Sequence, residues 1–341
     1  MLSCLRRIIY SGIPILPFFF LFLVYSCAEG DISVVLLPRT KVCVLSDDVL
    51  IDYPYSMEMI DSCKFVVSSS DKVLMFSTSG QLIREIGNSG RAIGEYSFPM
   101  KVRKGDSGDI FVWSAGTMKF IQYDCDGVFK KEYPYESAIS DFKVYGGRIY
   151  IYTAGQRADN IIDVLDLSNG GLSGFDKDVS EFHKLLATNI SPAPIWLLND
   201  NVYYAPKDVT EIRVNDGGEA ACLFKSKSFF VDKKVDLSQV KSSRRKRQEY
   251  LAEASYNLLL FEKDGELELL SYEGESEISD NRLDNSNRII TLYSIGKNAR
   301  HFPAESIGCL SSLSICGGKC YFLEHKIIEG NDSYSLFSTS F

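Results

Sequence analysis

Histidine is the side chain that most often transfers protons or binds a catalytic metal near neutral pH. The chain has three histidines, His183, His301 and His325. A zinc site built on one helix needs two histidines three or four residues apart, and no pair has that spacing. No serine stands in the Gly-x-Ser-x-Gly turn that is typical of α/β-hydrolases. From local motifs we therefore predict no catalytic residue, no metal ligand and no cofactor.

Three glycines, Gly87, Gly90 and Gly94, have a spacing that would suit a phosphate-binding loop. Such a loop continues into Gly-Lys-Ser/Thr and then into a helix whose N-terminus faces the anion. Neither that ending nor a helical pattern follows Gly94. The stretch is better explained as a connector between strands.

The densest cluster of charge is the basic run Arg244–Arg247, inside the polar stretch 240–249. We predict an insertion there, which is either a solvated loop or a contact with anionic lipid or an acidic partner. The whole chain has a net charge of −8. A nucleic-acid-binding protein needs the opposite sign, so we expect no nucleic acid as a partner.

A repeat of hairpins runs through the middle of the chain. Each hairpin is an apolar strand, a turn ending in Gly, and a second strand, because Gly accepts the positive φ of a tight turn. The turn glycines are Gly80, Gly127, Gly170 and Gly217, at intervals of 47, 43 and 47 residues. A further pair of strands precedes each hairpin, which makes four strands per repeat. Units of this length with four strands are typical of propeller blades.

The register gives blades one to four directly, and the rest of the chain has room for two more. The fifth blade would run from Asn257–Phe261 to Arg288–Tyr293. The sixth would combine 309–324 and 334–341 with an early strand at Ile32–Leu37, which removes exposed sheet edges. We therefore predict an all-β, six-bladed β-propeller with four-stranded antiparallel blades. The alternative is a β-sandwich followed by a second β domain.

The N-terminus has the pattern of an export signal. Arg6 and Arg7 precede an apolar run, Ile8–Tyr25, that two prolines interrupt. This predicts a signal peptide over residues 1–26 rather than a spanning helix. The ending Val-Tyr-Ser-Cys resembles a lipobox, which implies lipid on Cys27 and a single domain over residues 27–341. The alternative is ordinary signal cleavage after Ala28.

The connector 87–96, Gly-Asn-Ser-Gly-Arg-Ala-Ile-Gly-Glu-Tyr, carries a more specific likeness. It resembles the first interblade loop of six-bladed propeller lipoproteins from Bacteroides-type bacteria, which have NHL-like or TolB-like folds. Ala92 and Ile93 replace the usual glycine and proline of that loop. The resemblance covers roughly residues 30–341. It implies a fold and a place in the cell envelope, as an outer-membrane lipoprotein, but no defined activity.

Propellers often bind ligands on one face, and the blade model places Glu95, Tyr96 and Trp113 near one rim. We predict these three as ligand-binding residues, because aromatic rings offer stacking area. The alternative for Trp113 is packing between blades. The predicted function is an exported, lipid-anchored binding module for an envelope protein, peptide or glycan.

The alternative function is a metal-dependent hydrolase or lyase that uses the propeller channel. Propeller lactonases and related hydrolases hold calcium there with scattered Asp, Glu and Asn residues, and Asp141, Asp163 and Asn199 are candidates here. Three or more such oxygens at metal-ligand distance would favour the enzyme. An apolar or plugged channel would favour the binding module.

Overall fold

The computed structural model describes residues 35–46, 51–154, 159–177, 179–188, 192–216, 221–225, 240, 243, 245–246, 249–250, 254–274, 277–279, 282–284, 288–328 and 331–341. The predicted signal peptide 1–26 and Cys27 lie outside the described residues, as does part of the basic stretch 240–249. The chain divides after Val34, and the fold described below belongs to the unit Val35–Phe341.

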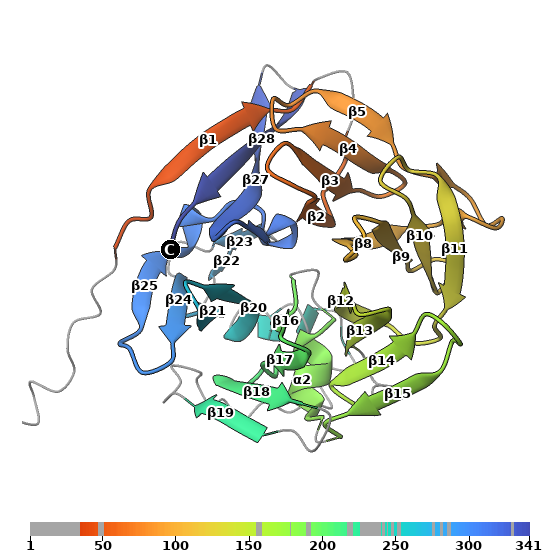
Figure 1. Ribbon diagram of the computed structural model, residues 1–341. Coiled ribbons are helices and arrows are strands. Elements are labelled where there is room, and N and C mark those ends of the chain that lie inside the picture. The colour runs from red at the N-terminus through yellow and green to blue at the C-terminus, as the bar shows by residue number, and fades with distance from the viewer. Residues whose placement is uncertain are drawn as a thin grey trace, which may run out of the picture. The chain divides into compact units, whose positions relative to one another are not determined.

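Six sheets of four antiparallel strands surround a central axis, which confirms the predicted six-bladed β-propeller (Figure 1). From the innermost strand outward, the first three blades are β2 (Ser56–Met59), β3 (Lys64–Ser68), β4 (Val73–Ser77) and β5 (Leu82–Glu85); β8 (Pro99–Lys104), β9 (Ile110–Ser114), β10 (Lys119–Tyr123) and β11 (Phe129–Pro134); and β12 (Ile139–Tyr145), β13 (Arg148–Thr153), β14 (Ile162–Asp166) and β15 (Leu172–Phe175).

The last three blades follow the same order, except that a small hairpin interrupts blade 5 and that the outer strand of blade 6 comes from the start of the chain. They are β16 (Ile195–Leu198), β17 (Asn201–Tyr204), β18 (Glu211–Asn215) and β19 (Ala221–Lys225); β20 (Tyr256–Lys263), β21 (Glu266–Glu273), β24 (Ile289–Ser294) and β25 (Arg300–Pro303); and β26 (Ser314–Cys316), β27 (Lys319–Ile328), β28 (Asn331–Thr339) and β1 (Arg39–Val44). A small hairpin, β22 (Glu277–Ser279) and β23 (Arg282–Asp284), interrupts blade 5. This hairpin accounts for part of the long interval that the sequence shows between Gly217 and Gly296.

The sixth blade joins the two ends of the chain, as predicted, but the early strand was placed too early. β1 begins at Arg39 and pairs with β28 from Arg39↔Thr339 to Val44↔Ser335. The apolar residues of Val35–Leu37 have other uses: the Val35 N–H donates to the His301 carbonyl of blade 5, and Leu37 is buried in a core cluster. Pro38 then separates this packing segment from the strand.

Two of the connections between blades contain short elements, and only the first of them was not predicted. The helix α2 (Glu181–Leu186) lies between blades 3 and 4, and its six residues are too few to show a helical period. Ser180 begins it by accepting a hydrogen bond from the His183 N–H. The connector 87–96 contains the short parallel pair β6 (Asn88–Ser89) and β7 (Glu95–Tyr96), as expected of an interblade loop.

Apolar side chains of neighbouring blades fill the space between them. Trp113 and Phe120 of blade 2, for example, pack with Phe142 and Ile151 of blade 3 in one buried cluster. Near the rim the turn between the third and fourth strands touches the preceding blade. A Cβ on Gly80 would lie 1.9 Å from the Val44 carbonyl oxygen, and Gly80 has φ +91°. Glycine is therefore required there by both space and backbone conformation.

We predict that a chain truncated to begin after Val44 is unstable, because blade 6 loses its outer strand and β28 becomes an open edge. Thermal unfolding should show a Tm at least 10 °C below that of a control chain that begins at Val35, or aggregation in its place, since one degree of Tm is worth only a fraction of a kcal/mol. Equal Tm values for the two chains would contradict the closure.

Candidate functional site

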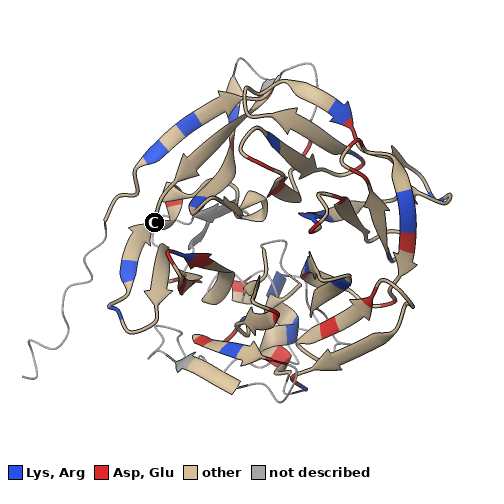
Figure 2. Cartoon of the chain, in the orientation of Figure 1, with Lys and Arg blue, Asp and Glu red and all other residues tan. Residues whose placement is uncertain are grey.

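Charged residues stand on several of the innermost strands, next to the propeller axis, where binding sites of propellers are usually sought (Figure 2). Arg103 on β8 and Asp141 on β12 form a buried ion pair, with 2.5 Å between Nη2 and Oδ2. Both side chains are 2 % exposed. Arg103 Nη1 also donates to the Ser56 hydroxyl at 2.9 Å and lies 3.5 Å from Glu58 of blade 1. One guanidinium therefore links three blades.

The protonation of this pair follows from its surroundings. Burial alone would raise the pKa of Asp141, but the positive charges of Arg103 and Lys101 outweigh burial and hold it at about 2. Asp141 is therefore a carboxylate at neutral pH. Burying such an ion pair costs desolvation free energy. A substitution that removes one partner would leave the other charge buried without its counter-charge.

The chain itself covers this ion pair. The Ala193 N–H, just before β16, donates to Asp141 Oδ2 at 3.1 Å. Lys207 Nζ donates to the carbonyls of Pro192 at 2.7 Å and Asn257 at 2.9 Å, which ties the same segment to blade 5. The Pro192–Ala193 segment is thus hydrogen-bonded to the inner strand of blade 3 and, through Lys207, to blade 5.

The three calcium candidates do not meet. Asp141 is used in the ion pair. Asp163 accepts hydrogen bonds from the Tyr135 hydroxyl at 2.7 Å and from Asn160 at 2.8 Å. Asn199 lies exposed in the turn between β16 and β17, with φ +51°. No group of three or more His, Cys, Asp or Glu side chains that could hold a metal ion occurs among the described residues.

The three predicted rim residues are used mainly inside the protein. Tyr96 is buried, and its hydroxyl accepts a hydrogen bond from the Val73 N–H at 3.1 Å. Trp113 is 1 % exposed and packs against Phe120 with 4.7 Å between ring centroids. Glu95 is partly exposed and accepts a hydrogen bond from the Ala92 N–H. Neither ring offers a free face to a ligand in this arrangement, and a binding role for the three residues stays a prediction.

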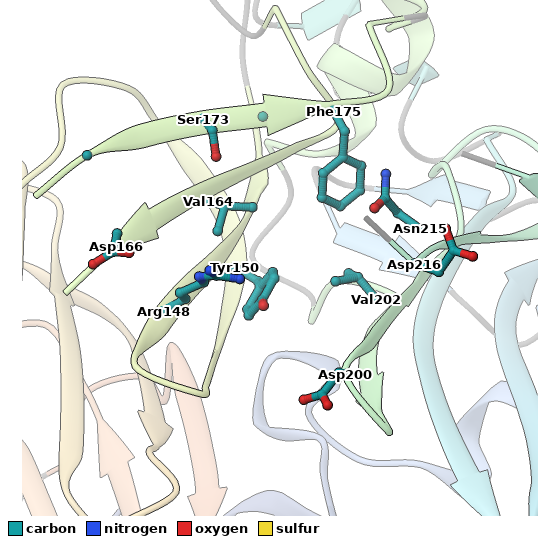
Figure 3. A pocket seen from close by; sticks show the side chains of 12 residues that line it. Arg148, Tyr150, Val164, Asp166, Ser173, Phe175, Asp200, Val202, Asn215 and Asp216 are labelled. Atoms are coloured by element: carbon teal, nitrogen blue, oxygen red, sulfur yellow. The ribbon is translucent and has the colours of Figure 1, made fainter. Parts of the chain in front are cut away.

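A more open site lies between blades 3 and 4. It is a groove of about 500 Å³. Figure 3 shows the side chains that reach into it from the two blades. Its floor is apolar and aromatic and its edge is polar; the lining residues are Tyr150, Val164, Phe175 and Val202 below, and Arg148, Asp166, Ser173, Asp200, Asn215 and Asp216 around. Pockets with an apolar floor and a few polar groups are typical ligand sites.

Strand alternation explains which residues line the groove. Tyr150 on β13 lies opposite Val164 on β14, and Val164 lies opposite Ser173 on β15. Residues paired in this way point to the same face of the sheet. Because β15 contributes only Ser173 at this level, the outer part of the gap between the blades is not filled.

The groove is acidic. Its lining holds three aspartates, Asp166, Asp200 and Asp216, against one cation, Arg148. Hydrogen bonds from the side chain and backbone N–H of Ser168 lower the pKa of Asp166, which keeps it charged at neutral pH. The charge of Asp200 and its hydrogen bond raise the pKa of the nearby Tyr145. The groove therefore attracts positively charged groups.

No local motif in the sequence indicates this groove, because its residues come from several strands and turns spread over positions 148–216. A comparison between repeats does carry a signal. The blade 2 residue that corresponds to Ser173 is Lys131, because Lys131 pairs with Gln122 on β10 in the way that Ser173 pairs with Val164 on β14. A long side chain in one repeat and a serine in the next marks a difference in how the gap is filled.

The family model described as a 6-bladed β-propeller, DUF5128, matches residues 44–253, which is more than half of the chain. The chain belongs to this family. The match begins within β1 and extends past blade 4, so it includes both sides of the groove. No curated protein sequence matches the chain significantly.

Solved structures agree with the family's fold. An exported protein of Bacteroides fragilis, so described in its structure report, is 16 % identical with a TM-score of 0.63, over 90 % of this chain and 97 % of that one. A DUF4221 protein of Bacteroides vulgatus is 9 % identical with a TM-score of 0.64 over the same shares. A streptogramin B lyase reaches 14 % identity over 90 % and 88 %, with a TM-score of 0.49. At these identities the likeness shows the fold alone.

Two buried lysines in the channel make stability depend on pH. Burial lowers the pKa of Lys207 to about 7 and that of Lys101 to about 8, from 10.5. Between these values and 10.5 the two lysines bind more protons in the unfolded chain than in the folded one, so their contribution to the free energy of unfolding rises as pH increases.

We predict that Lys207→Met flattens this rise. Denaturant unfolding at pH 7, 7.5 and 8 should give the wild type a more positive slope than the variant, by at most about 1.4 kcal/mol per pH unit. The matched control Lys64→Met changes an exposed lysine and should keep the wild-type slope. A Lys207→Met variant whose stability changes with pH as that of the wild type does would contradict the account.

Proposed function

We propose that this protein is an exported binding module that is attached to the cell envelope through lipid on Cys27. Its ligand is an envelope protein, peptide or glycan, and the ligand lies in the groove between blades 3 and 4. One observation carries the proposal: the charged pair near the axis is buried and hydrogen-bonded within the chain, whereas the groove is open and lined by convergent polar groups.

The fold supports a binding role in a second way. Most groove residues stand on paired strands and Tyr150 is buried at its base, whereas Asp200 and Asp216 lie in the turns next to β17 and β18. Sites on rigid elements bind without first ordering a loop. Among the residues that the structure describes, no helix is long and apolar enough to cross a bilayer. The proposed attachment rests on the lipid signal at Cys27.

Filling the groove should remove partner binding. In a pull-down from the native envelope, Ser173→Tyr should lose the partner that the wild type captures, because the larger ring occupies the space above Val164. The control Ser62→Tyr places the same ring on an exposed turn of blade 1 and should retain the partner. Capture by Ser173→Tyr at the wild-type level would show that the groove is not the binding site.

Changing Cys27→Ala should remove the anchor. Metabolic labelling with an alkyne fatty acid should mark the wild type and not the variant, and the variant should leave the membrane fraction, because several acyl chains are needed for stable attachment. A labelled Cys27→Ala protein, or an unlabelled wild type in the membrane fraction, would contradict the proposed anchor.

A further inference from the structure

The gap between blades 2 and 3 shows how this fold closes the space that is open one blade later. Lys131 on β11 extends across that gap and donates from Nζ to the Leu167 carbonyl of blade 3 at 3.1 Å. Its ammonium lies 4.8 Å from the centre of the Tyr133 ring. The lysine thus makes a cation–π contact within its own blade and a hydrogen bond to the next one.

Blade 3 has the same arrangement of positions without the lysine. In blade 2, Phe111, Gln122 and Lys131 lie side by side on β9, β10 and β11. In blade 3, Tyr150, Val164 and Ser173 lie side by side on β13, β14 and β15. The aromatic residue of the second strand is retained. On the two outer strands the side chains are shorter in blade 3. Val164 stands where blade 2 has Gln122, and Ser173 stands where blade 2 has Lys131.

The aromatic partner of the lysine is retained as well. Tyr133 pairs with Phe120 in blade 2, and Phe175 pairs with Ile162 in blade 3. Phe175 therefore offers a ring where Tyr133 meets the Lys131 ammonium. Figure 3 shows Phe175, Val164 and Tyr150 around one space, which the Ser173 side chain leaves unfilled.

The chemistry of the groove suits a long side chain with a positive end. The four methylenes of lysine pack well on apolar and aromatic surface while the ammonium stays at a polar edge. Here the floor is Tyr150, Val164, Phe175 and Val202, and the edge carries the three carboxylates named above. Arg148 opposes Asp166 across paired strands, so the exposed Asp200 and Asp216 on the blade 4 side attract the ammonium, and Asp200 also has a hydrogen bond with Tyr145. The volume of about 500 Å³ leaves space for the backbone that carries such a side chain.

We propose that the groove binds a lysine side chain of a partner polypeptide, in the position that Lys131 takes between blades 2 and 3. This inference rests on the proposed function, and it narrows the ligand from protein, peptide or glycan to a lysine-bearing protein segment. The acceptors for the ammonium are the blade 4 carboxylates and the π face of Phe175.

The test uses the full chain and a set of host peptides. The peptides are Gly/Ser-rich 9-mers that differ at the central residue, which is lysine, Nε-acetyl-lysine or glutamine. Isothermal titration or NMR shifts measure their affinities. The lysine peptide should bind at least tenfold more tightly than either neutral peptide, because acetylation removes the charge but keeps the stem. Equal affinities for the three peptides would overturn the inference.

Variants of the protein test where the lysine peptide binds and whether the groove carboxylates attract it. Ser173→Lys supplies the missing lysine within the chain, so it should abolish binding of the lysine peptide and keep the wild-type Tm or raise it. Asp200→Asn together with Asp216→Asn should weaken lysine binding at least fivefold without changing the affinity for the glutamine peptide. The control Glu305→Gln removes a negative charge at an exposed position outside the groove, and it should leave the affinity for the lysine peptide unchanged. A lysine peptide that binds Ser173→Lys as it binds the wild type would also overturn the inference.

The two proposals fail separately. If Ser173→Tyr loses the envelope partner but acetylation of the peptide has no effect, the groove binds a partner by other chemistry and only the lysine inference is wrong. If Ser173→Tyr keeps the envelope partner, the groove is not the site and both proposals are wrong.

Discussion

Burial between neighbouring blades is the constraint on which the rest of the molecule depends. Each sheet has two faces, and apolar side chains on them leave water only when another blade packs against each face. Six blades satisfy this only as a closed ring, and the ring closes through the pairing of β1 with β28. Because the packing must be continuous, a gap in it is informative. The groove between blades 3 and 4 is such a gap.

The charged residues near the axis and those at the groove have different surroundings. At the axis the inner strands bring charged residues together, and the protein neutralises them internally: Arg103 pairs with Asp141, and Lys207 donates to two carbonyls. Burying such groups is costly unless each finds a partner, so the closed network favours a fixed structure over a ligand site. At the groove the carboxylates are on the edge and in water, where they cost little and remain available.

Much of the fold was accessible from sequence because hairpin turns have local rules. Gly80, Gly127 and Gly170 take positive φ as the repeat register requires. The start of β1 was misplaced, because an apolar run such as Val35–Leu37 looks the same whether it pairs in a sheet or packs between blades. The Arg103–Asp141 pair could not be predicted, since the two residues lie 38 positions apart with no motif around them. The predicted rim aromatics, Tyr96 and Trp113, were correctly placed on strands, but their burial depends on neighbours that only the fold supplies.

Photo-crosslinking in the native envelope tests the central claim most directly. A photoreactive residue, p-benzoylphenylalanine, would replace Ser173 in the groove or Glu95 at the rim in separate variants. The account predicts a covalent adduct with an envelope partner from position 173 and none from position 95, at equal expression of the two proteins. An adduct from position 95 without one from position 173 would contradict it, because the partner would then lie at the rim and not between blades 3 and 4.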